Sequence, residues 1–147
     1  MYRVLQGHNG KVADATYVAG ADMKKGMLVV KGTDGKVVFP STATDKNVFF
    51  VGKELIATGI DGDRDLPDYS DVFENIKEGE FVTSEQPVSG EVYFTDQTTG
   101  TFSVGGYATV GTDGKLVSTT AATRIQVRNT AAKDCGTHIG IEVAILD

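Results

Sequence analysis

Short apolar runs, each closed by a turn signal, dominate the hydrophobic pattern of this chain. The clearest run is HIGIEVAIL at residues 138–146, where an isoleucine or valine stands at every second position from Ile139 to Ile145. Side chains of a strand point alternately to its two faces, so this run predicts a half-buried strand with those side chains inward. RIQVR at residues 124–128 alternates in the same way and predicts another strand.

Several further apolar runs lie between glycine-rich turns, and helical periodicity is scarce. Together these runs predict an all-β fold, either a compact β-sandwich or a β-barrel, with a β-tulip-like barrel as one form and at most one short helix. The best helix candidate is SDVFENIK at residues 70–77, where Ser70 or Asp71 would cap the first turn. The further predicted strands are residues 26–31, 36–39, 47–57, 80–84, 90–95, 101–104, 107–110 and 115–118.

The stretch GTDGK occurs twice, at residues 32–36 and 111–115. Asp tolerates a positive φ and Gly adopts one without steric cost, so Asp-Gly between two β-rich runs is a strong hairpin signal. We therefore expect hairpins centred on Asp34-Gly35 and Asp113-Gly114, with either a two-residue turn or a longer loop built on a type I turn. Convergence on a favoured turn is the simpler explanation of the repeat, and duplication of a hairpin unit is the alternative.

Length, charge and cysteine content narrow the class of protein. The chain has 147 residues, of which 40% are hydrophobic, and we expect one β-rich domain over residues 1–147. Its formal charge of −6 argues against nucleic acid or an anionic membrane as partner, since both require clustered basic residues. The single cysteine excludes an internal disulfide, and neither a signal peptide nor an apolar run long enough to span a membrane is visible. We expect synthesis and folding in a cytoplasm.

An acidic stretch, DGDRDLPDYSD at residues 61–71, places carboxylates at alternate positions, as some calcium loops do. An EF-hand loop starting at Asp61 would need glycine and glutamate where Leu66 and Val72 stand. A solvated acidic loop is therefore the expected role, and no metal-binding residue is assigned.

Cys135 and His138 form the one local pair that is suited to nucleophilic chemistry, and His8 is the only other histidine. A cysteine nucleophile needs a positioned base and an orienting group, and a zinc site needs further ligands that the chain does not offer in sequence. A buried or turn-edge cysteine is the expected role. We predict that the protein is not an enzyme and has no catalytic residues, no cofactor-binding residues and no cofactor.

The chain resembles a known class of proteins in pattern rather than through a diagnostic motif. The stretches AGADMKKGMLVVKGTDGKVVFPSTATDKNVFFVG and FSVGGYATVGTDGKLVSTTAATRIQVRNTAAKDCGTHIGIEVAIL are similar to small virion proteins of tailed bacteriophages, of the capsid decoration or head-stabilising class. The resemblance covers most of the chain. No functional residue is carried over from it.

The resemblance implies a structural role with defined partners. Such a protein binds the outer surface of an icosahedral capsid, with the major capsid protein as partner, as a homo-oligomer in which a trimer is favoured, and without nucleic acid or membrane. It is made in the host cytoplasm and ends on the capsid exterior of the virion. An extended N-terminal arm of about residues 1–10 would add a strand to a neighbouring subunit. The predicted partner-binding residues are Met1, Tyr2, Arg3, Val4 and Leu5.

The main alternative is a β-barrel module that binds a small ligand or a carbohydrate. Sugar sites favour exposed aromatic platforms, and the chain has no tryptophan but five tyrosines.

Overall fold

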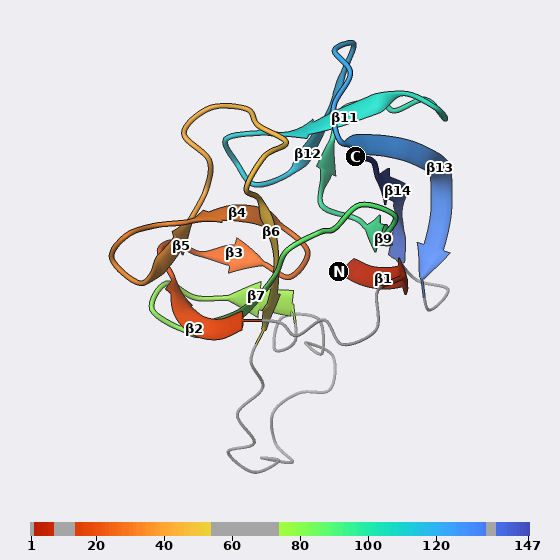
Figure 1. Cartoon of the computed structure of the whole chain (residues 1–147). Helices are drawn as coiled ribbons and strands as arrows, with labels where there is room; N and C mark the ends of the chain where they lie inside the picture. Colours follow the sequence, from red (N-terminus) through yellow and green to blue (C-terminus); the bar gives the residue numbers. More distant parts are fainter. Residues whose placement is uncertain (1, 8–13, 54–73, 135–137) are drawn as a thin grey trace, which may run out of the picture.

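The computed structural model describes residues 2–7, 14–53, 74–134 and 138–147. The protein is an all-β molecule that contains a closed five-stranded barrel, a seven-stranded sheet and a small two-stranded sheet (Figure 1). The predicted fold class is therefore confirmed. The strands are β1 (Tyr2–Gln6), β2 (Asp14–Ala19), β3 (Met23–Lys24), β4 (Leu28–Lys31), β5 (Lys36–Val38), β6 (Phe49–Lys53), β7 (Asn75–Ile76), β8 (Phe81–Glu85), β9 (Val92–Thr95), β10 (Thr98–Thr99), β11 (Tyr107–Val110), β12 (Leu116–Thr119), β13 (Ile125–Asp134) and β14 (His138–Ile145).

Both GTDGK stretches form the predicted hairpin turns, the first between β4 and β5 and the second between β11 and β12. In each turn the N–H of the first glycine donates to the carbonyl of the lysine at 2.8 Å. The glycine of each Asp-Gly pair, Gly35 or Gly114, has a φ of 75°. This left-handed backbone suits glycine because it lacks a Cβ. The turns are of the longer type, since three residues lie between the hydrogen-bonded glycine and lysine.

The strands around the two turns also match in register. Lys31 lies opposite Val37 in the first hairpin, and Val110 lies opposite Leu116 at the same distance from the second turn. A parallel strand then joins each hairpin: Ala19 of β2 lies opposite Val37, and Thr98 of β10 lies opposite Leu116.

The correspondence extends to the closing strands. Strand β6 pairs with β4 and β8, and β13 pairs with β11 and β14, all antiparallel. Gly26 N–H donates to Val51 O at 2.8 Å, and Gly105 N–H donates to Val127 O, also at 2.8 Å. Because pairings far from the turns repeat, the structure supports duplication of a whole five-stranded unit rather than convergence on one turn. We call residues 14–85 the first module and residues 92–145 the second module.

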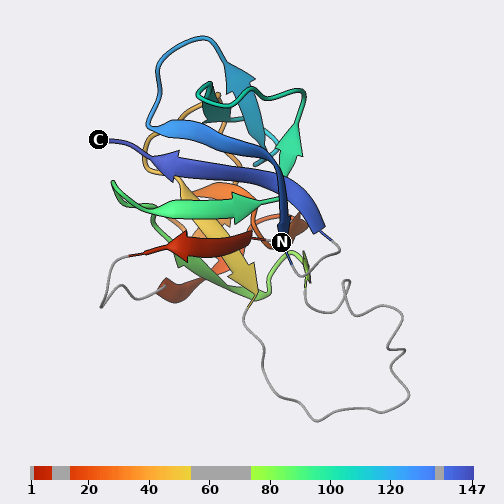
Figure 2. The ribbon, with the colours of Figure 1, turned by 90° about the vertical axis from the view of Figure 1, so that its right-hand side faces the viewer.

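The second module departs from the first in one strand. The place of β2 is taken by β9 and β10, which are consecutive in the chain but lie far apart in the strand order β1-β9-β14-β13-β11-β12-β10. The first module is thus a closed barrel, whereas the second is broken between Thr95 and Thr98. Strand β1 is added to the outer edge of β9 and forms the lower edge of the sheet in Figure 2.

Two apolar clusters hold the modules. The interior of the first barrel contains Val29, Val37, Val51 and Val82 among others. The larger cluster combines Leu28, Val48 and Phe50 of the first module with the interior of the second. The Phe50 ring stacks on the Tyr93 ring with centroids 4.6 Å apart. The modules therefore share a continuous core.

Three sequence predictions need correction. Residues 70–73 of the predicted helix lie outside the described residues, and Asn75 and Ile76 form β7, which pairs with β3. Residues 101–104, predicted as a strand, are irregular and run into a turn in which Gly106 N–H donates to Ser103 O at 3.0 Å. In β14, Ile139 is 67% exposed rather than inward, and it lies before Ile141, the first β14 residue that pairs with β9.

Candidate functional site

The predicted partner-binding segment forms the edge of the seven-stranded sheet. Met1 lies outside the described residues, and Tyr2, Arg3, Val4 and Leu5 belong to β1. Strand β1 pairs antiparallel with β9 and with no other described strand. Its outer side therefore presents backbone N–H and C=O groups away from the sheet, which is the arrangement that accepts an added strand.

A bulge shapes this edge. Val4 lies opposite Tyr93 and Gln6 lies opposite Val92, so Leu5 is an extra residue in β1. Val4 packs against the shared core, whereas the Leu5 side chain is 47% exposed. The strand is thus anchored by one side chain and presents the next to solvent.

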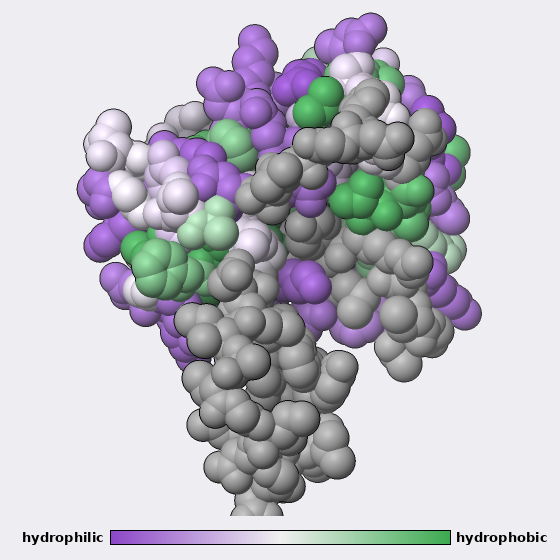
Figure 3. Space-filling view, turned by 60° about the horizontal axis from the view of Figure 1, so that its bottom comes forward, coloured by the Kyte–Doolittle hydropathy of each residue, from purple (hydrophilic) through white to green (hydrophobic). Residues whose placement is uncertain are grey.

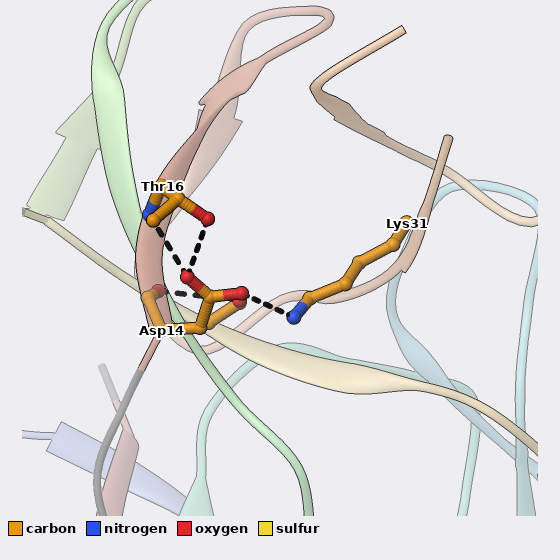
Figure 4. Close-up of polar contacts among 4 residues, drawn as sticks. Asp14, Thr16 and Lys31 are labelled. Carbon is orange, nitrogen blue, oxygen red and sulfur yellow. Dashed lines mark hydrogen bonds and ion pairs between the residues drawn. The ribbon is translucent and has the colours of Figure 1, made fainter. Parts of the chain in front are cut away.

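A polar cluster closes one end of the first barrel (Figure 4). Asp14 Oδ2 accepts a hydrogen bond from Lys31 Nζ at 2.6 Å, and Asp14 Oδ1 accepts from Thr16 N–H at 2.9 Å and from the Thr16 hydroxyl at 2.6 Å. The Ser84 hydroxyl donates to the backbone carbonyl of Asp14 at 3.3 Å. The Lys31 ammonium and the Thr16 donors lower the pKa of Asp14 to about 2.

Lys31 also lies over two aromatic rings. Its Nζ is 4.8 Å from the Tyr17 ring centroid and 4.5 Å from the Phe49 ring centroid, within the range of cation–π attraction. The Lys31 charge thus has both a carboxylate and aromatic faces for partners inside its own module. This cluster ties β2, β4 and β8 together and is best explained as a structural closure of the barrel.

The equivalent positions in the second module are apolar. Tyr93, Val110 and Val143 stand where the first module has Asp14, Lys31 and Ser84, and all three are 0% exposed. Burial raises the pKa of the Tyr93 hydroxyl above its usual value, and this hydroxyl donates to Glu91 Oε2 at 2.6 Å. The second module is therefore fully buried at the positions of Asp14 and Lys31, which are 33% and 23% exposed in the first.

The Cys135–His138 pair is only partly described. Cys135, His8 and the acidic loop of residues 61–71 lie outside the described residues. His138 Nδ1 lies 3.0 Å from Asp96 Oδ2, and Gln97 Nε2 donates to Asp96 Oδ1 at 2.7 Å. Within the described ranges, no group of three or more His, Cys, Asp and Glu residues is arranged to hold a metal.

Sequence reasoning missed a groove at the break in the second module. It has a volume of about 420 Å³ and lies between β10, the segment that follows it, and the start of β14. The repeated threonines of TDQTTGTF were the available signal, but they do not reveal that the strand is interrupted. The groove is lined by Thr98, Gly100, Thr101, Phe102, Thr130, Ile139, Gly140 and Ile141.

Apolar side chains are exposed on both modules. Figure 3 shows apolar surface on either side of the grey residues. Among the residues that the structure describes, the large apolar side chains with high exposure are Leu5, Val38, Phe81, Val88, Val104 and Ile139.

Comparison of the chain with models of protein families, with curated protein sequences and with solved structures found no match. In the part of the chain that the structure describes, no helix has the length and apolar character needed to cross a membrane.

Proposed function

We propose that the protein is a virion structural protein that binds the outer surface of an icosahedral phage capsid and stabilises it. The observation that carries the proposal is β1, an N-terminal strand at the edge of the seven-stranded sheet whose outer side pairs with no described strand. The resemblance of the chain to decoration proteins supports a capsid as the partner, and the N-terminal arm was separately predicted to make the contact with the major capsid protein.

The architecture suits this role physically. Two modules that share one core form a rigid unit, which loses little conformational entropy when it binds. Strand addition at β1 would supply directional backbone hydrogen bonds, and the exposed Leu5 would supply an apolar contact. Many copies on one shell, each a homo-oligomer with a trimer favoured, would convert modest contacts into firm attachment.

The test is binding to phage heads that lack this protein. Purified protein is mixed with expanded heads, and bound copies are counted after sedimentation. Stoichiometric, saturable binding and a higher head melting temperature are expected. Absence of binding, together with a thermal shift caused by a sugar or another small ligand, would instead support the ligand-binding alternative.

A matched pair of variants tests the role of β1. Leu5→Lys places a charge on the proposed contact and should weaken binding roughly tenfold, a loss of about 1.4 kcal/mol. Val88→Lys changes a side chain of similar exposure, 42% against 47%, outside β1 and should bind as the wild type. Equal binding by the two variants would remove β1 from the interface.

A further inference from the structure

The groove of the second module occupies a place that the first module fills with its own backbone. In the first module β2 stays paired with the chain of β8 to its end: Ala19 N–H donates to Glu80 O at 2.8 Å, and Gly79 N–H donates to Ala19 O at 2.8 Å. These bonds close the barrel.

The second module breaks this ladder. Thr98 stands in the place of Ala19, and its N–H donates to Asp96 O at 3.0 Å. Strand β9 leaves β14 after Thr95, and β10 pairs with β12 alone among the described strands. The contacts of Asp96 with His138 and Gln97 hold the chain in this bent course.

The backbone of Ile139 faces the groove. Ile145 N–H donates to Glu91 O at 2.9 Å and Ile145 O accepts from Gly90 N–H at 2.8 Å, so Ile145 directs its backbone groups to the β9 side of β14. Along a strand, the backbone groups of every second residue point to the same neighbour, so those of Ile139 also point to the β9 side of β14. Because β9 ends at Thr95, the N–H and C=O of Ile139 point into the groove.

The lining favours an uncharged occupant. None of its residues is charged: it combines threonine hydroxyls, the Phe102 ring, isoleucine side chains and two glycines. A charged side chain in the groove would lose hydration without gaining an opposite charge. Gly140 lets the end of β9 approach β14 closely beside the groove, since a Cβ there would lie 2.3 Å from Thr95 O.

We infer that the groove binds an extended, uncharged peptide segment of another protein chain, which adds its backbone to β14 at Ile139 as β2 adds to β8 in the first module. Strand addition supplies affinity through main-chain hydrogen bonds, and the threonine and Phe102 side chains select small or β-branched side chains. This site goes beyond the proposed function: it is a second edge, separate from β1, and it does not require the partner to be a capsid.

The probe is a capped hexapeptide with the sequence of residues 15–20, ATYVAG, the strand that closes the first module. At millimolar peptide, the amide NMR signals of Thr98, Ile139 and Gly140 should shift and saturate. The control peptide carries proline in place of Ala19, which removes the N–H that would donate to Ile139 O. It should bind roughly tenfold more weakly.

Variants of the protein locate the contact. Ile139→Pro removes the N–H that faces the groove, whereas Ile139→Thr keeps it. Thr130→Arg fills the groove, and Thr112→Arg places the same side chain on an exposed turn. Binding should be lost in Ile139→Pro and Thr130→Arg and retained in the other two.

Three results would overturn the inference: no shift with the peptide, equal binding of the proline peptide, or shifts at these amides with a neutral trisaccharide such as maltotriose but not with the peptide. Thr130→Arg keeps the test decisive if Ile139→Pro does not fold. Measuring how Leu5→Lys and Thr130→Arg bind to phage heads distinguishes the groove from β1, since each variant alters only one of the two sites.

Discussion

The two modules repeat one strand plan but differ at the same end of the barrel. The first ends in a solvated cluster around Asp14 and Lys31, and the second has Tyr93 and Val110 at those positions, buried beneath the first module. The environment differs because the first module packs against this end of the second module. No described part of the chain packs in the same way on the corresponding end of the first module. In repeat proteins the outermost unit likewise carries a polar face. The difference shows that this barrel end serves as an interface between the modules in the second unit and faces solvent in the first.

The two GTDGK turns also differ in packing, again with the first exposed and the second packed against the other module. Nothing lies within 4 Å of a Cβ placed on Gly35, whereas Gly114 is packed against Phe39 and its carbonyl accepts from Leu28 N–H at 2.7 Å. The pairing of β4 with β5 ends at Val30 and Val38, so the Leu28 N–H lies beyond it and donates to the second turn. One sequence thus forms a solvent-exposed turn in the first module and a contact between modules in the second.

Exchanging the residues at the barrel ends should have the largest effect. Val110→Lys places a lysine, the residue found at the equivalent position 31 of the first module, in a fully buried site. Tyr93 stands there in place of Asp14, the aspartate that pairs with Lys31. An unpaired buried charge and the loss of apolar burial should lower the free energy of unfolding by about 5 kcal/mol. Urea unfolding followed by fluorescence or circular dichroism measures the loss.

The reciprocal change is its control. Lys31 is 23% exposed, so Lys31→Val removes a partly solvated ion pair and should change the stability by about 1 kcal/mol or less. Similar losses in the two variants would mean that the two barrel ends are not differently buried.

The break in the second module gives the next largest effect. Gly140 corresponds to Phe81, which is 53% exposed, but a Cβ on Gly140 would lie 2.3 Å from Thr95 O and 3.0 Å from Asp96 Cα. Gly140→Ala should therefore force β9 away from β14 and lower stability by about 3 kcal/mol. Phe81→Ala should cost less than about 1 kcal/mol. Thermal unfolding separates the two, and a small effect of Gly140→Ala would disprove the close approach.

The two turn glycines provide a finer comparison. Both have a φ of 75°, so alanine should cost about 1 kcal/mol at either position through backbone strain. At Gly114 the new Cβ also meets the Phe39 ring at 2.7 Å and Leu28 O at 3.0 Å, which should raise the loss to about 2.5 kcal/mol. Chemical denaturation of both variants measures the difference. If the losses are equal, the second turn does not pack on the first module.

Local signals made part of this fold predictable. Asp-Gly between β-rich runs specified both hairpins, and alternation specified β14, because turns and half-buried strands depend on neighbouring residues. Strand β2 was missed because a bulge between Asp14 and Tyr17 disrupts the period of two. The last part of the helix predicted at residues 70–77 shows the converse, since Asn75 and Ile76 pair with β3 as strand β7 despite the short helical pattern.

The duplication and the groove depend on distant residues. The core requires only apolar side chains of suitable volume, so Val37 and Leu116 serve equally at one position and leave little sequence identity outside the turns. The groove depends on the point at which β9 leaves β14. That point is held by the contact of Asp96 with His138, and the two residues are far apart in sequence. No local pattern encodes that contact. The edge position of β1 is equally non-local, although its sequence suggested a partner-binding strand.

The smallest effect concerns protonation, and only the first barrel end should show it. The pKa of Asp14 is about 2, below the usual value near 3.8, because Lys31 and Thr16 favour its charged form. A carboxyl with a lowered pKa stabilises the fold fully above about pH 4, and the contribution is lost as the pH falls towards 2. The stability difference between wild type and Asp14→Asn should therefore be constant from pH 6 to pH 4 and should disappear near pH 2. In a Lys31→Met background the difference should be smaller above about pH 4, since the strongest partner of Asp14 is gone. A difference that grows on acidification would show that the Asp14 carboxylate is not stabilised by these contacts, and the polar end of the first barrel would then need another explanation.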